Sequence, residues 1–425
     1  MRNEPVGLYE RLAYTLENNN GQNVTLWFLS DSATDYFEYE NTVVNKLRTR
    51  FGKEKIRYRH RPYPEDAKPG NIKEWLIHHH QEYTFFFVCD ADSMIPKGAL
   101  LKLLQKGEHP DNAHVAIFQT RIEIAHAKTL FSKYQALSAR TSQKLYTDVK
   151  QRFFRTALSF GHGNLIRTNA FLRIQVPKGV LSHDIWDMAL LNQLGYKTVY
   201  CPDVVSFEEA PNNYLEMRIR DRRWIKGNFQ SAPLLLKKGL SLGTRFYLSY
   251  GLFMYLCQPI VLCWIVLNLM GNSSLWGQFL YFKPIINTGM HPLYIEMSTC
   301  TIIILSLVFL HKFVLCKTLR DCSLIMKETI FSTLLSLNNI IYHTIDILII
   351  SFQTIRWVPM KKNPYATLTF IKATRQMWPG TLFGIAVVYF IMNYCPHIAL
   401  LIVPIVIIFS LSIPIMYITS LPLSR

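Results

Sequence analysis

Few of the 425 residues are of the kinds that build zinc sites or disulfide frameworks. The eight cysteines are scattered, with no C-x-x-C pair and no Cys/His cluster at the spacing of a zinc site. Several of them lie in apolar runs, where cysteine acts as a small hydrophobic residue. We therefore expect all of them to be reduced and structural, which argues against a zinc-finger or a redox-active C-x-x-C function.

The sequence also lacks a basic patch interleaved with aromatic residues, although its formal net charge is +17. Without such a patch, a nucleic-acid partner is not expected. No internal repeat or low-complexity tract stands out, and the N-terminus, MRNEP, is not a signal peptide. The chain is distinguished instead by its hydrophobic residues, which make up 50% of the sequence and are unevenly spread.

Long runs with almost no charge begin after residue 245, whereas residues 1–245 have the composition of a soluble α/β protein. Runs of about 18 or more apolar residues are candidate membrane helices. Four runs qualify, of which the third is short: Tyr247–Met270, Ser298–Leu315, Thr381–Tyr394 and Ile398–Thr419. We therefore predict a transmembrane domain of about four spans over residues 246–420, after a basic juxtamembrane segment over 231–245.

Residues 329–353 form a further apolar run, which is interrupted by four polar side chains: Asn338, Asn339, His343 and Asp346. Polar groups that face lipid are costly, so this segment is expected to lie at the interface, to re-enter, or to line a cavity enclosed by protein. Lysines and arginines flank the predicted spans, except in the loop 272–297. The positive-inside rule then places the N-terminal domain in the cytoplasm and that loop outside.

Residues 85–93, FFFVCDADS, form a β-prone run that ends in two aspartates one residue apart. A strand of this kind is buried in a sheet, and open α/β sheets bind ligands at the carboxyl ends of their strands. Asp90 and Asp92 could both reach one Mg²⁺ or Mn²⁺ ion, which commonly also binds a diphosphate. The alternative is a strand followed by an acidic turn without a metal.

Helix-like and strand-like segments alternate before the first apolar run. Helices are predicted over 5–18, 38–50, 70–80 and 97–105, and strands over 23–29, 56–59, 85–89 and 115–119. Such alternation indicates an α/β fold with a doubly wound, mostly parallel sheet. Polar clusters at Asp31, at Asp90 and Asp92, and at Gln119–Arg121 end three of these strands and are expected to meet at one edge.

Eight short motifs occur in the order seen in membrane-bound family 2 glycosyltransferases, which the chain resembles over nearly its whole length. They are LSDS (29–32), KPGN (68–71), DADS (90–93), FQTR (118–121), GHGN (161–164), LSHD (181–184), EEAPN (208–212) and RDRRW (220–224). Within that family the set is most similar to the glucosyltransferases of osmoregulated periplasmic glucan synthesis, and more distantly similar to cellulose synthase.

The resemblance implies a GT-A-like fold over residues 1–230 and inverting transfer of glucose from UDP-glucose to a growing β-glucan. It also implies a multi-pass protein of the bacterial inner membrane with a cytoplasmic catalytic domain. A divalent cation, Mg²⁺ or Mn²⁺, is the implied cofactor. The implied partners are the UDP-sugar donor, the glucan acceptor, the lipid bilayer and a periplasmic glucan-processing protein.

The same resemblance assigns roles to individual residues. For the donor, Asp31 would help bind the uridine, Lys68 and Asn71 would lie near the nucleotide, and Asp90 would contact the donor, whose diphosphate the metal on Asp92 would bridge. Gln119 and the turn from Gly161 to Asn164 would line the acceptor channel. Asp184 would be the catalytic base, and Arg223 and Trp224 would close the site from an interfacial helix.

The residue types suit this chemistry, and each also has a purely structural interpretation. Inversion needs a carboxylate to take the proton of the attacking hydroxyl, and the departing diphosphate needs positive charge nearby. Asp184 could instead only cap the helix that follows it. The arginines around Arg223 could face lipid headgroups, and Trp224 could be an interfacial anchor.

Two departures from the family pattern bear on activity. The chain has Arg220–Trp224 where the wider family has Gln-x-x-Arg-Trp, although the glucan glucosyltransferases resemble the arginine form. The sequence also starts after the point where the first strand of the GT-A sheet and the preceding spans are expected. Two alternatives therefore remain: a related polysaccharide synthase with another donor, and a truncated, inactive membrane protein with a binding or regulatory role.

Overall fold

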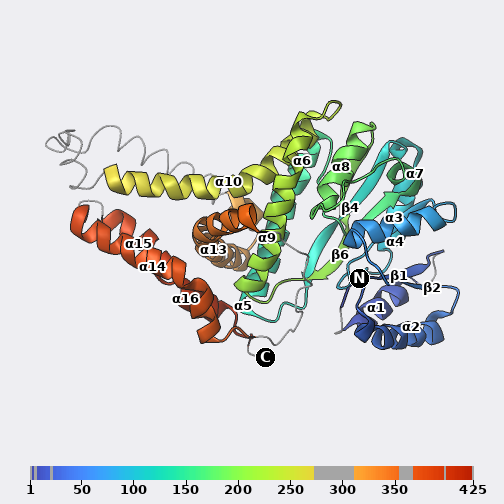
Figure 1. Ribbon diagram of the computed structural model, residues 1–425, viewed down its shortest axis with the longest axis horizontal. Coiled ribbons are helices and arrows are strands. Elements are labelled where there is room, and N and C mark those ends of the chain that lie inside the picture. Colours follow the sequence, from blue (N-terminus) through green and yellow to red (C-terminus); the bar gives the residue numbers. More distant parts are fainter. Residues whose placement is uncertain are drawn as a thin grey trace.

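The computed structural model describes residues 2–3, 7–19, 23–271, 311–353, 367–396 and 399–423. Figure 1 shows an α/β part, built from the first half of the chain, beside a group of long helices from the second half. Helix α9 (Tyr214–Ser231) stands between the two parts. The predicted order, an α/β domain followed by an α-helical domain, is confirmed.

The N-terminal segment folds around a small parallel sheet. Strands β1 (Leu26–Ser30) and β2 (Ile56–His60) pair in register from Leu26 opposite Ile56. Helices α1 (Leu8–Asn19) and α2 (Phe37–Phe51) pack their apolar faces against it. Helix α3 (Ala67–His79) follows β2, and its buried Trp75 joins a cluster with Trp27 of β1 and Phe86 of the next strand.

The main sheet has the order β3-β5-β4-β6. Its strands are β3 (Phe85–Val88), β4 (Val115–Ala125), β5 (Asn164–Arg167) and β6 (Lys197–Glu209). β4 and β6 are parallel, whereas β5 runs antiparallel to both β3 and β4. The sheet is therefore mixed, where the alternation of elements predicted a mostly parallel one, because the chain reverses at residues 161–163 and re-enters between β3 and β4.

Helices cover the main sheet and fill the space toward α9. α4 (Ala99–Glu108) and α8 (His183–Gln193) pack against it, and the short α7 (Thr168–Phe171) follows β5. α5 (Leu130–Ser142) and α6 (Asp148–Phe154) follow β4, with one π-helical turn between them. Within the described residues, the elements fall close to their predicted bounds as far as β4, which is longer than expected.

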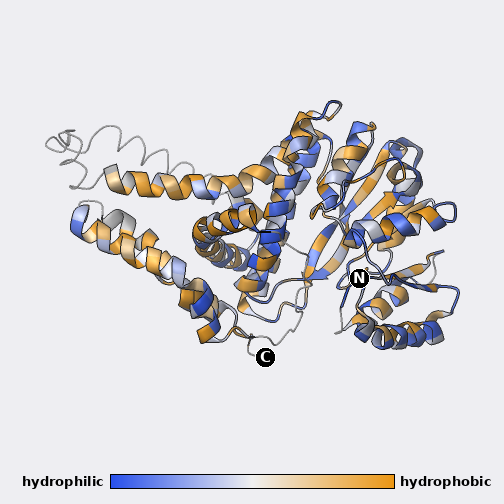
Figure 2. Ribbon diagram, viewed as in Figure 1, coloured by the Kyte–Doolittle hydropathy of each residue, from blue (hydrophilic) through white to orange (hydrophobic). Residues whose placement is uncertain are grey.

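The second half contains the long helices α10 (Leu242–Gly271), α13 (Leu319–Phe352) and α14 (Phe370–Tyr394) and the shorter α15 (Ala399–Ser410) and α16 (Ser412–Thr419). Among the described residues, three helices are long and apolar enough to cross a membrane: Leu242–Leu267, Leu319–Phe352 and Phe370–Tyr394. In Figure 2, where the ribbon is coloured by hydropathy, these helices consist largely of hydrophobic residues. The structure therefore supports membrane association of this half.

The predicted spans compare unevenly with these helices. The run from Tyr247 lies within α10, and the run from Thr381 lies within α14. Ser298–Leu315 falls mostly outside the described residues. The last predicted span is divided at Leu411 into α15 and α16. Residues 329–353 belong to one unbroken helix, α13, rather than to a hairpin; its position relative to the membrane stays a prediction.

The polar residues of α13 face protein. Tyr214 of α9 donates a hydrogen bond to Asn339 Oδ1 at 2.7 Å, and Ser412 of α16 donates one to Asn338 Oδ1 at 2.5 Å. Asp346 is fully buried. Because these side chains point at α9 and α16, an uninterrupted apolar helix can carry them without exposing them to lipid. The expectation of a protein-enclosed environment fits this arrangement.

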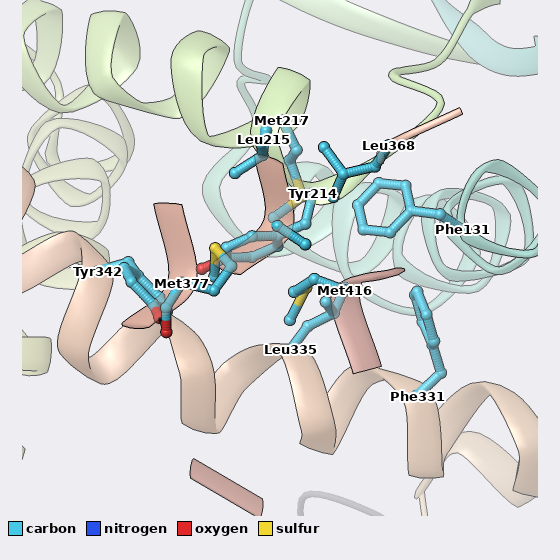
Figure 3. Close-up of a cluster of buried hydrophobic side chains, with 11 residues drawn as sticks. Phe131, Tyr214, Leu215, Met217, Phe331, Leu335, Tyr342, Leu368, Met377 and Met416 are labelled. Atoms are coloured by element: carbon cyan, nitrogen blue, oxygen red, sulfur yellow. Dashed lines mark hydrogen bonds between the residues drawn. The ribbon is translucent and has the colours of Figure 1, made fainter. Parts of the chain in front are cut away.

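A buried apolar cluster joins the two halves of the molecule. Tyr214, Leu215 and Met217 of α9 pack with side chains of α13, α14 and α16, and Phe131 of α5 packs on the same cluster. Figure 3 shows how these residues interdigitate between the helices. Burial of this many large side chains fixes α9 against the helical half, since each contributes about 1.5–3 kcal/mol of transfer free energy.

Candidate functional site

The first functional cluster lies where β1 and β2 end. Asp31 follows β1, and both of its carboxylate oxygens accept hydrogen bonds from Arg61, which follows β2; the Nε–Oδ1 and Nη2–Oδ2 distances are 2.7 Å. Asn71 of α3 donates to Asp31 Oδ1 at 2.7 Å. All three side chains are buried. A bidentate, doubly hydrogen-bonded carboxylate of this kind has a fixed orientation, which suits recognition of a planar group.

Lys68 connects this cluster to the aspartates after β3. It lies in the first turn of α3, one turn before Asn71, and its Nζ contacts Asp90 Oδ1. The same Nζ donates to the carbonyl of Gly161 at 2.8 Å. The two residues before it, Asp66 and Ala67, have left-handed φ angles of 53° and 46°. Such conformations are costly for residues other than glycine and tend to persist at functional sites.

Asp184 lies on the other side of Gly161. A β-carbon at Gly161 would lie 3.1 Å from that of Asp184, so the two residues are in contact. Lys68 thus joins Asp90 to the turn that touches Asp184. In the structure, Lys68 and Gly161 therefore link the two positions. That the two carboxylates face one cleft stays a prediction.

The position of Asp184 in its helix argues against a role only in capping. Ser182 is the N-cap of α8, and Asp184 lies within the first turn. Burial raises the pKa of the Asp184 carboxyl, the charge of Asp187 adds to this rise, and His183 and Lys68 oppose it. A carboxylate whose pKa is raised is a stronger base than an exposed one, which is the property that proton abstraction requires.

Asp92 lies just past Asp90 and is buried. Within the part of the chain that the structure describes, no group of three His, Cys, Asp or Glu side chains is placed to hold a metal ion. Mg²⁺ commonly takes one or two carboxylates and completes its shell with water and substrate phosphate oxygens. The donor set at Asp90 and Asp92 therefore fits a cation shared with a diphosphate, and does not fit a site made of protein ligands alone.

The turn of residues 160–164 is held from below by Gln119. Its Nε2 donates to the carbonyls of His162 and Gly163 at 3.0 and 3.2 Å, and its Oε1 accepts from the backbone N–H of Phe160 at 2.8 Å. Gln119 is fully buried, as is Asn164, which donates to Ser159 Oγ at 3.1 Å. Both side chains shape the turn in this structure, and their direct contact with an acceptor stays a prediction.

His162, at the tip of this turn, is a charged residue that the sequence patterns did not single out. Its Nε2 lies 3.1 Å from Glu208 Oε2. Burial lowers the pKa of His162, but the charges of Glu208 and Asp90 and the hydrogen bond to Glu208 outweigh it, and the pKa is raised to about 9. The imidazole of His162 is then positively charged at neutral pH, and it lies within electrostatic reach of the Asp90 carboxylate.

Helix α9 presents its arginines to two different surroundings. Arg223 is within electrostatic reach of Asp90 of the cleft; burial and the nearby Arg220 lower the pKa of Arg223, and Asp90 opposes this. Trp224 is 45% exposed and stacks under the Arg220 guanidinium, 4.1 Å from the ring centre. Of the predicted closing pair, the structure therefore relates Arg223 to the cleft, while the role of Trp224 there stays a prediction.

The same helix packs tightly against the segment that carries Asp184. A β-carbon at Gly227 would lie 2.0 Å from Ser182 Oγ and 2.9 Å from the Ser182 backbone nitrogen. Gln230 accepts a hydrogen bond from the N–H of Leu181 at 2.9 Å and donates one to the carbonyl of Gly179 at 3.0 Å. α9 therefore sets the position of the start of α8.

Comparison with known proteins gives one family and several relatives. Residues 85–314, more than half of the chain, match the family described as "Glycosyl transferase family group 2". The chain is similar to glucans biosynthesis glucosyltransferase H of Bradyrhizobium diazoefficiens, at 32% identity over 57% of this chain and 34% of the relative. The protein of the same description from Rhodopseudomonas palustris is 30% identical over 65% of this chain and 40% of the relative.

The chain thus spans about two-fifths or less of the length of these two relatives. Among solved structures it is similar to a mannosyltransferase from Pyrobaculum calidifontis in complex with GDP-Man and Mn²⁺. That likeness has a TM-score of 0.45 and 14% identity, and covers 82% of this chain and 85% of the other. A likeness at this level transfers neither a ligand nor a metal.

Proposed function

Because this chain belongs to the glycosyl transferase family group 2, we propose that it transfers glucose from UDP-glucose to a growing β-glucan, with inversion at the anomeric carbon. The resemblance that the sequence motifs predicted is confirmed at the level of the family. The observation that carries the proposal is the connection from Asp90 through Lys68 and Gly161 to Asp184. We propose that these contacts bound one cleft with a carboxylate on each side.

Asp184 is the catalytic base in this proposal. Its carboxylate takes the proton of the acceptor hydroxyl as the hydroxyl oxygen bonds to the anomeric carbon and the bond to the UDP oxygen breaks. Burial raises the pKa of the Asp184 carboxyl above its usual range, so its carboxylate binds a proton more readily than that of an exposed aspartate does. Its neighbour Gly161 leaves space for the acceptor where a side chain would contact Asp184.

The departing diphosphate develops negative charge, and three cations of this chain surround its expected place. Lys68 contacts Asp90, His162 is held by Glu208, and Arg223 is within electrostatic reach of Asp90. Fixed charges of this kind stabilise a transition state without reorganisation. A Mg²⁺ or Mn²⁺ ion bound through Asp92 would supply further charge neutralisation to the diphosphate oxygens.

The donor's base would lie on the cluster at the ends of β1 and β2. Asp31 is held by Arg61 and Asn71, so its carboxylate is oriented before the nucleotide binds. This arrangement avoids the entropy cost of ordering the side chain on binding. Lys68 extends from the same helix as Asn71, and so links the base-binding side of the cleft to the diphosphate side.

The cellular setting follows from the helical half of the molecule. We propose that the three candidate membrane helices anchor the chain in a bacterial inner membrane, with the α/β domain in the cytoplasm as the loop charges predict. The glucan acceptor and a periplasmic glucan-processing protein are the partners that this setting implies.

The test uses membranes that carry the whole chain, labelled UDP-glucose and Mg²⁺. We expect incorporation of label into a glucan, and a loss of at least about 100-fold in Asp184→Asn, since a general base contributes about 10²–10⁴-fold. Asp203→Asn, which changes an exposed carboxylate on β6, is the matched control and is expected to keep full activity. Absence of transfer by the unaltered chain, or full activity of Asp184→Asn, would contradict the proposal.

Donor identity is tested separately by competition with other nucleotide sugars. Unlabelled UDP-glucose should dilute the label fully, and an excess of another UDP-sugar should not. Preferred use of another donor would identify a related polysaccharide synthase. A chain that binds UDP with Mg²⁺ but transfers no sugar would instead have a binding role.

A further inference from the structure

One carboxylate in the helical half holds two arginines of α9. Asp346 of α13 is fully buried. Its Oδ2 accepts from Arg218 Nε at 2.9 Å, and its Oδ1 accepts from Arg218 Nη2 at 2.9 Å. Oδ1 also accepts from Arg222, with distances of 3.0 Å to Nε and 2.6 Å to Nη2. We call this three-residue group the α9–α13 ion cluster.

The ion cluster occupies one face of α9. Arg218 and Arg222 are four residues apart, so they project from the same side of the helix. Arg223 follows at once and therefore projects about 100° further around the axis. It is the arginine within electrostatic reach of Asp90. The angular position of α9 about its own axis thus decides whether Arg223 faces the cleft.

Other contacts keep α9 close to α13 without setting that angle as tightly. Met217 of α9 shares the cluster of Figure 3 with Leu335 of α13, and Ile225 packs on Ile350. Lys226 donates to the carbonyl of Ile350 at 3.2 Å. Apolar packing is non-directional, whereas a bidentate guanidinium–carboxylate pair has a defined geometry. Single hydrogen bonds also join the two helices, from Tyr214 to Asn339 and from Lys226 to Ile350. The ion cluster is the bidentate contact between α9 and α13, and therefore an orienting element.

We propose that Asp346 is a positioning residue for glycosyl transfer, which fixes the rotation of α9 so that Arg223 faces the donor side of the cleft. The proposal rests on the proposed function and adds a residue outside the cleft to it. It also explains why a charged residue, Asp346, lies within α13, which is one of the candidate membrane helices. The membrane half thereby contributes to the arrangement of the catalytic half.

The test compares Asp346→Asn and Asp346→Glu with Glu328→Gln in the full chain. Glu328 is a matched control because it is an equally buried carboxylate of α13, paired with Lys312 and Ser332 rather than with α9. We expect Asp346→Asn to lower kcat per folded molecule about 10–100-fold, as misplacement of a charge-stabilising group does. The KM for UDP-glucose should change less than kcat. Asp346→Glu should recover most of the rate, and Glu328→Gln should retain it.

Two double changes separate positioning from a general structural role. If Asp346 acts through Arg223, then Asp346→Asn adds little to the loss already caused by Arg223→Ala, because effects that share one group are not additive. Fully additive losses would overturn the proposal. If Asp346→Asn fails to fold, Arg218→Lys tests the same point, since it keeps the charge but loses the bidentate pairing with Asp346; normal kcat in that variant would overturn the proposal.

A readout that needs no sugar transfer keeps this inference distinct from the proposed function. Arg223→Cys introduces a thiol at position 223. Its reaction with a water-soluble methanethiosulfonate reagent is followed by peptide mass spectrometry, in chains that carry Arg223→Cys alone or together with a second change. We expect Asp346→Asn to change the labelling rate at position 223 at least about threefold, and Glu328→Gln to leave it unchanged. An unaltered rate would refute the positioning role, whether or not the chain transfers glucose.

Discussion

A fully buried carboxylate and a partly buried one, on opposite sides of α9, are held in contrasting ways. Asp346, on the side of the helical half, is compensated by two guanidinium groups and fully removed from solvent. Asp184, on the side of the sheet, lies at a cleft where burial raises the pKa of its carboxyl. In the first arrangement both carboxylate oxygens accept hydrogen bonds from guanidinium groups. In the second, burial makes the ionised form of the carboxyl costly.

This contrast separates charges that position from charges that react. A carboxylate that is held by guanidinium groups on both oxygens fixes the groups around it. An under-compensated carboxylate destabilises the fold when ionised, and that cost is the source of its basicity. In this chain both kinds act on the same segment, since α9 also packs against the start of α8.

The largest predicted difference between the two carboxylates is in thermal stability. Removing the charge in Asp346→Asn leaves the buried Arg218 and the partly exposed Arg222 without their partner, and loss of a buried ion-pair partner typically costs about 3–5 kcal/mol. Asp184→Asn removes an ionised group whose raised pKa opposes folding at neutral pH, so its Tm should stay equal or rise. Thermal unfolding in detergent at pH 7 measures both, and a fall in Tm for Asp184→Asn would contradict the contrast.

Removal of divalent cations should affect only the sheet side of α9. Chelation with EDTA is expected to lower transfer by at least about 100-fold, since the diphosphate then departs without the charge that a metal supplies. Mg²⁺ or Mn²⁺ should restore it. The Tm in the absence of donor should change little. In the described part of the chain, no group of three His, Cys, Asp or Glu side chains is placed to bind a metal ion tightly without the donor. Full activity in EDTA would contradict the role given to Asp92.

The contact between α9 and α8 is tested by Gly227→Ala. A β-carbon there meets Ser182 backbone and side-chain atoms, so the helices must separate, at a cost of about 1–3 kcal/mol. We expect a lower Tm together with lower kcat. Gly251→Ala is the control, because its β-carbon meets only the end of the Asn228 side chain, which can move. Equal effects of the two changes would disprove the specific contact.

The pH dependence of activity should show the titrations of two groups, the carboxyl of Asp184 and the imidazole of His162. Transfer is expected to rise with pH as Asp184 loses its proton above the usual aspartate range, and to fall near pH 9 as His162 loses its charge. His162→Gln should remove the fall in activity near pH 9.

The pairing of His162 with Glu208 stabilises the fold by roughly 1–3 kcal/mol below pH 6.5, and this stabilisation is lost as the pH rises through about 9. A Tm difference between the unaltered chain and His162→Gln that does not shrink over this range would contradict the assignment.

The smallest effect is expected at the nucleotide end. Arg61→Lys keeps the charge but loses the bidentate pairing with Asp31, and should weaken binding of UDP about 3–10-fold. Arg57→Lys changes an exposed arginine of β2, the strand that precedes Arg61, and should not weaken binding. Calorimetric titration with UDP in the presence of Mg²⁺ measures both, and equal affinities would show that the orientation of Asp31 is unimportant.

Much of the cleft could be predicted from the sequence because its residues directly follow strands or open helices. Asp31, Asp90 and Asp184 are of this kind, and Lys68 with Asn71 belongs to one short motif. Local pattern could not reveal Arg61 as the partner of Asp31, His162 as that of Glu208, or Asp346 as that of Arg218. These pairs join residues 30, 46 and 128 positions apart. Their partners depend on how the elements pack.

The same limit explains what was predicted differently in the fold. The antiparallel insertion of β5 depends on left-handed glycines at 161 and 163, whose effect on strand order is not local. The polar residues of α13 predicted an interfacial or re-entrant segment, because their partners on α9 and α16 are distant in sequence. In each instance a feature that looks irregular along the chain is satisfied by a contact between elements.

The most direct test of the central claim is a structure of the full chain with UDP and Mn²⁺ bound. The account predicts Mn²⁺ within ligand distance of Asp92, about 2.2 Å, with the diphosphate between Lys68 and Arg223 and the space for the sugar beside Asp184. Mn²⁺ and UDP bound elsewhere, or a UDP complex in which Asp184 lies remote from the diphosphate, would contradict it.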